Sequence, residues 1–311
     1  MTNEPTPDGL VALTHWGLMR ARGADAVKFL QGQLTNDVAT LGPERARLAG
    51  FCSAKGRLQA SFVVWQLAAD DLLLACHASV LPAAMKRLSM FVLRAQCKLS
   101  DAGAEWRLLG VAGPTATPWL AGLPVWGRGS ANGVSVVRLP DVDGVPRALL
   151  ARPAAEPVPE AAPLALDAWQ LLEVRSAIPV IEAATVDQFV PQMLNYEVVG
   201  GVDFQKGCYP GQEVVARSQY RGTIKRRMFL FSVAAHAEPG QEVFHSADPA
   251  QPAGMVVNAA SQGGATGGVA LVEVKLAALD AGTLHLGSAD GAPLHRLDLP
   301  YPLPSEAALS A

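Results

Sequence analysis

The last third of the chain has a different residue pattern from the part before it, and this pattern constrains the fold more than any other feature of the sequence. After residue 226, short β-rich runs alternate with Gly and Pro at regular spacing. The runs are 228–233, 242–244, 254–259, 267–274 and 282–286. Short strands punctuated in this way are typical of a small barrel. We therefore predict a C-terminal antiparallel barrel of five or six strands over these runs.

The residues before the barrel show a mixed pattern. Two β-rich runs, 61–67 and 71–77, are separated by a short polar turn, which predicts a hairpin. Apolar residues at helical spacing predict a helix over 79–96 with Ser79 as its N-cap, and 105–112 returns as a strand. Because 311 residues are too many for one ordinary core, we predict an α+β protein of two or three lobes.

Weaker signals predict four further segments. A short helix is expected over 23–33, with Asp25 as its N-cap. The Pro-rich stretch 151–163 is expected to form an exposed connection. A capping-box pattern at 167–170 predicts a helix through residue 176, and 187–196 is expected to form another short helix.

Composition and charge narrow the class of protein. Half of the residues are hydrophobic and 17% are charged, which excludes a disordered chain. The net charge of −3 gives no global attraction to nucleic acid or to a membrane surface. The first eight residues lack the pattern of a signal peptide, and the apolar stretch 72–85 is too short for a membrane span. We expect a soluble, cytoplasmic protein without a membrane partner.

Four cysteines occur at positions 52, 76, 97 and 208, and none has a partner at CxxC spacing. Such spacing excludes a sequence-local zinc or cluster site, so we expect no stably bound metal. Cys52, Cys76 and Cys97 are expected to be small buried hydrophobes.

Cys208 differs because of its neighbours. Gly207 and Gly211 permit unusual backbone angles on either side of it, and Pro210 suits the first turn of a helix over 211–219. A helix N-terminus and the nearby Lys206 both favour the thiolate form. The residues alone leave a second interpretation open, in which this segment is a tight turn with a buried thiol.

A basic cluster follows this segment, at Arg217, Arg221, Lys225, Arg226 and Arg227. Such a cluster could hold a phosphate, RNA or the glutamate tail of a folate, or it could form a solvated face. No aromatic residues alternate with the basic ones, so nucleic acid is the weaker alternative.

Trp16 and Trp169 each lie near the start of a predicted element. Tryptophan most often anchors a core or an edge. An indole can also stack on a flat heterocycle such as a pterin, and both interpretations stay open.

The segment 206–213, which reads Lys-Gly-Cys-Tyr-Pro-Gly-Gln-Glu, resembles the signature of the YgfZ family of folate-binding, aminomethyltransferase-like proteins. Further segments resemble that family in the same order along the chain. They are 31–38, 54–57, 110–113, 188–192 and 299–303. The resemblance covers nearly the whole chain, and the cysteine motif is its most specific part.

The resemblance implies a three-lobed α+β fold of the aminomethyltransferase (GcvT) type with a C-terminal barrel. A discontinuous folate-binding domain is expected over 1–50 and 130–222, a ferredoxin-like lobe over 51–129 and the barrel over 223–311. The resemblance also implies that the protein binds tetrahydrofolate or a related folate. It further implies a role in building or repairing iron–sulfur clusters in client enzymes, including those that methylthiolate tRNA.

Site residues follow from the resemblance by position. Cys208 matches the functional cysteine of the family, with Lys206 beside it, and Trp16 and Trp169 match positions of folate contact. The rest of the motif matches at Gly207, Tyr209, Gly211, Gln212, Glu213, Arg217 and Arg221.

Two departures from the family's relatives bear on activity. Aminomethyltransferases carry a pair of aspartates where this chain has Ala60 and Ser61, so glycine-cleavage activity is not expected. Many relatives carry a glutamate at the position of Arg175, which we expect to contact the folate differently because an arginine cannot accept a hydrogen bond.

Three functions are compatible with these features. The leading hypothesis is a folate-binding accessory protein for iron–sulfur enzymes that acts through Cys208, which is expected to lie next to the tetrahydrofolate pocket. The alternatives are a folate-dependent one-carbon transferase or demethylase, and an RNA-associated module that uses the cluster from Arg217 to Arg227.

Overall fold

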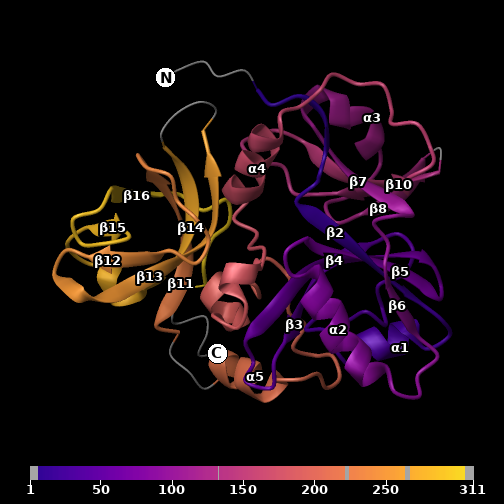
Figure 1. Ribbon diagram of the computed structural model, residues 1–311, viewed down its shortest axis with the longest axis horizontal. Coiled ribbons are helices and arrows are strands. Elements are labelled where there is room, and N and C mark those ends of the chain that lie inside the picture. Colours follow the sequence, from indigo (N-terminus) through magenta and orange to yellow (C-terminus); the bar gives the residue numbers. More distant parts are fainter. Residues whose placement is uncertain (1–5, 132, 221–223, 263–266, 305–311) are drawn as a thin grey trace.

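The computed structural model describes residues 6–131, 133–220, 224–262 and 267–304 (Figure 1). It contains two five-stranded sheets and one closed six-stranded barrel, with short helices between them. The predicted α+β class and the predicted C-terminal barrel are confirmed. Among the described residues, none of the helices combines the length and the apolar character that a bilayer crossing requires.

The first sheet has the strand order β3-β4-β5-β2-β6, and all its pairs are antiparallel. Its strands are β2 (Trp16–Arg22), β3 (Ala46–Cys52), β4 (Leu58–Ala68), β5 (Asp71–His77) and β6 (Lys98–Asp101). Strands β4 and β5 form the hairpin that the sequence predicted. Both are almost continuously buried, because this sheet is covered on both faces.

The second sheet has the order β1-β7-β10-β9-β8 and is also antiparallel. Its strands are β1 (Gly9–Ala12), β7 (Trp106–Ala112), β8 (Arg128–Ala131), β9 (Val134–Arg138) and β10 (Arg147–Pro153). Trp65 of the first sheet and Leu149 of the second belong to one buried cluster, so the two sheets share a core.

The sheets divide the chain differently from the expected boundaries at residues 51 and 129. Strands β2 and β3 precede residue 51 for most of their length, yet they pair with β5 and β4. Strand β7 lies inside the expected lobe 51–129, yet it pairs with β1 and β10. Pairing between strands that are far apart in sequence therefore determines which sheet a strand joins. A boundary drawn at one position of the chain does not describe this.

The barrel has the order β11-β14-β13-β12-β15-β16 and closes through β11 and β16. Its strands are β11 (Arg226–Val233), β12 (Glu242–His245), β13 (Asp248–Ser261), β14 (Gly268–Lys275), β15 (Leu284–Leu286) and β16 (Pro293–Leu297). Met228 and Leu230 of β11 point away from the barrel interior and belong to the same buried cluster as Phe62 of the first sheet. The barrel is therefore packed onto the rest of the protein.

The α-helices are α1 (Ala26–Gln31), α2 (Leu81–Val92), α3 (Thr117–Leu120), α4 (Leu166–Arg175) and α5 (Gln212–Tyr220). Short 3-10 turns lie at Gly113–Ala116, Ala183–Thr185, Pro191–Leu194 and Leu276–Leu279. Figure 1 shows α4 between the barrel and the second sheet, and α4 contacts β13 and β14.

Several predicted caps and one predicted helix are wrong. Ser79 does not cap α2; its hydroxyl is 2.8 Å from Nδ1 of His77 and accepts from the amide of Ala183. Helix α4 starts after Ala165 without a side-chain cap. Asp25 occupies the predicted N-cap position of α1, but its carboxylate accepts from the amide of Gln96 and makes no capping hydrogen bond. The segment 187–196 forms only the 3-10 turn Pro191–Leu194, because Pro191 cannot continue a helix that begins before it.

Candidate functional site

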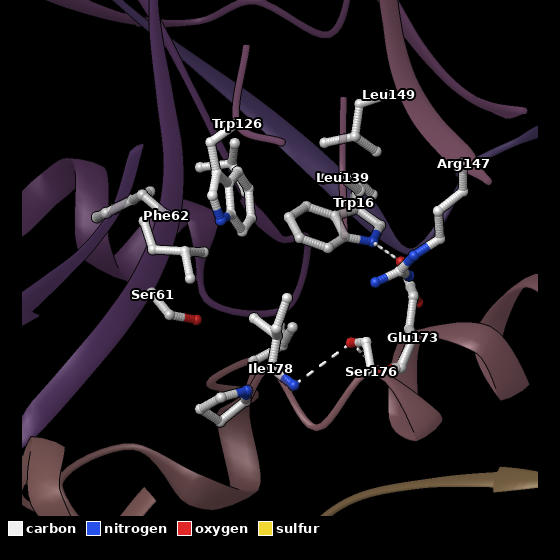
Figure 2. Close-up of a pocket in the computed structure, with 14 residues that line it drawn as sticks. Trp16, Ser61, Phe62, Trp126, Leu139, Arg147, Leu149, Glu173, Ser176 and Ile178 are labelled. Carbon is white, nitrogen blue, oxygen red and sulfur yellow. Dashed lines mark hydrogen bonds between the residues drawn. The ribbon is translucent and has the colours of Figure 1, made fainter. Parts of the chain in front are cut away.

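A mainly apolar cavity with about 470 Å³ of empty space lies where the two sheets meet the segment after α4 (Figure 2). Trp16 of β2, Trp126 and Phe62 of β4 supply aromatic walls. Aliphatic side chains from both sheets and from residues 178–180 complete it. Mainly apolar cavities with a few polar groups at their walls are typical of small-molecule sites.

Glu173 of α4 fixes the orientation of Trp16 in this cavity. Its Oε1 accepts from Nε1 of Trp16 at 2.8 Å and from Nε1 of Trp169 at 2.7 Å. Its Oε2 lies 2.8 Å from Nε2 of His15. Three partners therefore use both oxygens of this partly buried carboxylate, and Trp16 is held with one indole face available to the cavity.

Trp169 does not line the cavity. It is fully buried, and its ring lies directly on Gly110, where an added Cβ would come within 2.7 Å of the indole. Because no face of Trp169 is accessible, it cannot stack on a ligand as expected. It donates instead to Glu173, the residue that also orients Trp16. The two predicted tryptophans thus share one carboxylate but only Trp16 reaches the cavity.

Arg175 is not a lining residue either. Its Nη1 donates to the exposed Asp143 at 3.0 Å, and it is absent from the lining of the cavity. The acidic residue at the cavity is Glu173, which the sequence analysis missed. A signal for it exists, since Trp169 and Glu173 are four residues apart and therefore share one face of a helix.

Ser61 lines the cavity at the position where an aminomethyltransferase is expected to carry a carboxylate. Its hydroxyl accepts from the amide of Ile181 at 2.9 Å, and Ala60 is fully buried. Neither side chain can take up a proton at neutral pH.

A second cavity of about 570 Å³ adjoins the first and shares Trp16 and Glu173 with it. His15, His77 and Glu182 supply polar walls, and the barrel contributes residues that include Asn258. Burial lowers the pKa of His77, although Glu182 at 3.7 Å acts against this shift. The two adjoining cavities together therefore extend from the apolar walls beside Trp16 to the barrel.

The segment around Cys208 lies elsewhere, at the start of α5 (Figure 1). Lys206 donates from Nζ to the carbonyl oxygens of Gln31 and Leu34, each at 2.5 Å. Tyr209 is buried, whereas Cys208 is exposed. The thiol is therefore presented on a firmly anchored loop, and the interpretation as a buried thiol in a turn is wrong.

A close contact between two glycines packs the Cys208 loop against a second motif segment, 54–57. Gly211 has φ of +80°, and its backbone packs against Ser53 and Gly56. Gly56, with φ of +69°, in turn faces Val214 of α5. The structure thus joins segments 31–38, 54–57 and 206–213, which are far apart in sequence.

Neither cavity includes Cys208 or Lys206 among its lining residues. The expected proximity of Cys208 to the cavity is therefore not found. Glu213 does not reach back as a cap, because it pairs with Arg217 one turn later at 2.8 Å. In the described part of the chain, no group of His, Cys, Asp or Glu is arranged to hold a metal ion.

Most of the basic cluster is paired within the protein. Arg226 forms a bidentate pair with the buried Glu273, and Arg227 contacts Glu197 at 2.7 Å in a buried pair. Arg217 pairs with Glu213 at the surface, Lys225 is exposed, and Arg221 lies outside the described residues. Of the described members, Arg226 and Arg227 are therefore not free to bind an external anion.

Lys206 has an unusual protonation equilibrium that can be tested. Burial lowers the pKa of Lys206 to about 8. The neutral amine keeps two N–H groups, one for each carbonyl acceptor. We expect the Nζ signal of Lys206 to titrate with a midpoint near pH 8 in ¹⁵N-lysine NMR, assigned by its loss in Lys206→Arg.

The sign of the linked stability change follows from the same shift. The unfolded chain binds this proton more tightly than the folded chain, so Lys206 makes the free energy of unfolding rise between pH 8 and about 10.4. A midpoint at the ordinary lysine value would contradict the buried geometry.

Comparison with known proteins gives the class of this fold. Residues 7–139 match the model of the GCVT N-terminal domain. The structure superposes on the glycine cleavage system aminomethyltransferase T from Bartonella henselae with a TM-score of 0.73 at 16% identity, covering 94% of this chain and 85% of that one. The fold is therefore that of the aminomethyltransferase-like proteins.

Sequence relatives then give the family. The chain is 34% identical over 248 residues to the tRNA-modifying protein YgfZ of Sodalis glossinidius, covering 75% of this chain and 74% of the relative. It is 34% identical over 261 residues to the protein of the same name in Edwardsiella ictaluri, with 76% and 74% covered. The chain belongs to the YgfZ family, and the resemblance on which the sequence analysis relied is confirmed.

Proposed function

We propose that this protein binds a reduced folate in the cavity beside Trp16 and serves iron–sulfur client enzymes through the exposed thiol of Cys208. The observation that carries the first half is the cavity itself, with one indole held by Glu173 and a second supplied by Trp126. The observation that supports the second half is an exposed cysteine on a loop that two other segments hold in place, one by hydrogen bonds and one by packing.

The cavity residues fit a folate. Flat apolar walls suit a pterin ring, and the adjoining second cavity supplies polar walls for other parts of the molecule. A bound tetrahydrofolate would supply a carrier for one-carbon units. Trp16 and Trp126 would hold its ring, and Glu173 would act by fixing Trp16.

Cys208 is one thiolate ligand, whereas a cluster usually takes four protein ligands. A cluster is therefore cargo that Cys208 would share with a client enzyme. The relatives named tRNA-modifying protein YgfZ favour clients that modify tRNA. The thiolate could ligate the cluster transiently, or it could attack a disulfide sulfur of the client, which forms a mixed disulfide as the S–S bond breaks and the other sulfur leaves as a thiolate.

The two alternative functions have less support. A transferase or demethylase needs an acid or base, but Ala60 and Ser61 supply neither at the position of the aspartate pair, and Glu173 and His15 are paired with each other. An RNA module needs several free basic side chains, but Arg226 and Arg227 are each paired with a carboxylate.

Folate binding has a direct calorimetric test. We expect tetrahydrofolate to bind the purified protein, and Trp16→Ala to weaken binding about tenfold, since stacking on an aromatic side chain contributes roughly 1–3 kcal/mol. Trp119→Ala is the control, because Trp119 lies on α3 and lines neither cavity. Equal affinity in folded Trp16→Ala and in the unmodified protein would count against this binding site.

A further inference from the structure

Arg147 is a buried cation that faces the first cavity, and its guanidinium lies 6.0 Å from the centre of the Trp169 ring. Only 2% of its surface is exposed, yet it lines the cavity beside Trp16 and Glu173 (Figure 2). Its Nε donates to the carbonyl oxygen of Pro140 at 3.0 Å. Among the described residues, no hydrogen bond or ion pair engages Nη1 or Nη2 of Arg147.

Such an arrangement is costly unless a ligand completes it. Burying a guanidinium penalises its charged form, and burial lowers the pKa of Arg147 to about 10. Glu173 contributes a favourable field, but its two oxygens already have three partners in His15, Trp16 and Trp169. The remaining N–H groups are therefore available to water or to an acceptor on a ligand that enters the cavity from outside.

The chemistry of the acceptor follows from the shape of the site. Trp16 and Trp126 favour a flat ring, and a guanidinium donates only. The site therefore suits a flat heterocycle whose edge carries an oxygen acceptor. A carboxylate in the same place would instead select an edge that carries N–H donors.

Building on the folate site proposed above, we propose that Arg147 is a specificity-determining residue that donates to the 4-oxo group of a bound pterin. Its guanidinium and the stacked indoles together select a 4-oxopterin over a 4-aminopterin, because an amino group at that position presents N–H groups to a donor. Arg147 thus recognises the pterin by the edge that carries the oxygen.

A pair of ligands that differ only at this position tests the proposal. Tetrahydrofolate and tetrahydroaminopterin carry the 4-oxo and the 4-amino group on the same framework. We expect the unmodified protein to bind tetrahydrofolate at least tenfold more tightly in anaerobic titration calorimetry, since a buried donor left facing another donor loses its hydrogen bond. Arg147→Met should bind the two ligands with affinities that agree within about twofold.

Matched variants separate this role from a general effect on folding. Arg147→Lys keeps the charge but places its N–H donors on one nitrogen atom. It should therefore retain a reduced preference for the 4-oxo ligand. Arg138→Met is the control, because Arg138 lies on the neighbouring strand β9, donates to Leu123 and does not line the cavity. Its preference should equal that of the unmodified protein.

The outcomes are distinct. Equal binding of both ligands by the unmodified protein would overturn the role of Arg147 and leave the folate site intact. Binding of neither ligand would overturn the proposed function together with this inference. A preference that persists unchanged in folded Arg147→Met or Arg147→Lys would assign the selectivity to another group and reject the proposal.

Discussion

Replacing Cys208 with serine is expected to abolish rescue of a strain that lacks its own YgfZ-family protein. A serine hydroxyl ionises far less readily than a thiol and is a poor ligand for iron, so every chemical role proposed for Cys208 is lost. The side chain is exposed, so the free energy of unfolding should change by less than about 0.5 kcal/mol. Growth or client-enzyme activity gives the readout, and thermal unfolding gives the check on folding.

Cys97→Ser is a suitable control for this experiment. Cys97 is half-buried and lies in the first-sheet region just before β6, outside the motif loop. Burial raises the pKa of its thiol, which makes it a poor thiolate source. Rescue by Cys97→Ser and failure by Cys208→Ser at equal protein level would support the thiol hypothesis, and full rescue by Cys208→Ser would reject it.

Gly211→Ala is expected to destabilise the protein by about 3 kcal/mol, the largest effect on folding of any single substitution proposed for the motif loop. Its φ of +80° disfavours a residue with a Cβ, and that Cβ would lie 2.4 Å from the carbonyl oxygen of Ser53 and 2.7 Å from Cα of Gly56. These are backbone atoms, so a side-chain rotation cannot relieve the overlap. Denaturant unfolding measures the change.

Gly207→Ala is the matched control for Gly211→Ala. Gly207 stands on the other side of Cys208, and an added Cβ there would meet no atom within 4 Å. We expect its free energy of unfolding to stay within about 0.5 kcal/mol of the unmodified protein. If Gly211→Ala proved as stable as Gly207→Ala, the loop would be able to leave the contact with Gly56, and the anchoring of Cys208 would have to be explained differently.

The fold was largely predictable because its strands carry strong local signals. The hairpin of β4 and β5 and the barrel strands follow from β-rich runs between turn residues. The caps were not predictable, since Ser79 and Asp25 are well placed to cap a helix but find amide partners in other segments. Sheet membership was also missed, because a strand's partner is set by the whole fold.

The candidate site was predicted in part, and the misses have one physical cause. Trp16 reaches the cavity, while Trp169 and Arg175 lie on the same helix but point elsewhere. The position of a residue in a sequence motif does not show toward which side of a helix its side chain points. Arg147 was missed for a related reason, since it follows a turn in a strand-like run and resembles an ordinary surface arginine in sequence.

The pairing of Arg226 and Arg227 has a consequence for how the protein loses its structure. Successive residues of a strand point to opposite faces, so Arg226 lies on the face of β11 that carries Met228 and pairs with Glu273, whereas Arg227 lies on the opposite face and pairs with Glu197. Strand β11 cannot leave the barrel without exposing both carboxylates and the apolar surface that Met228 shares with the first sheet. The barrel and the sheets should therefore unfold in one cooperative transition, as a single thermodynamic unit in spite of their separate topologies.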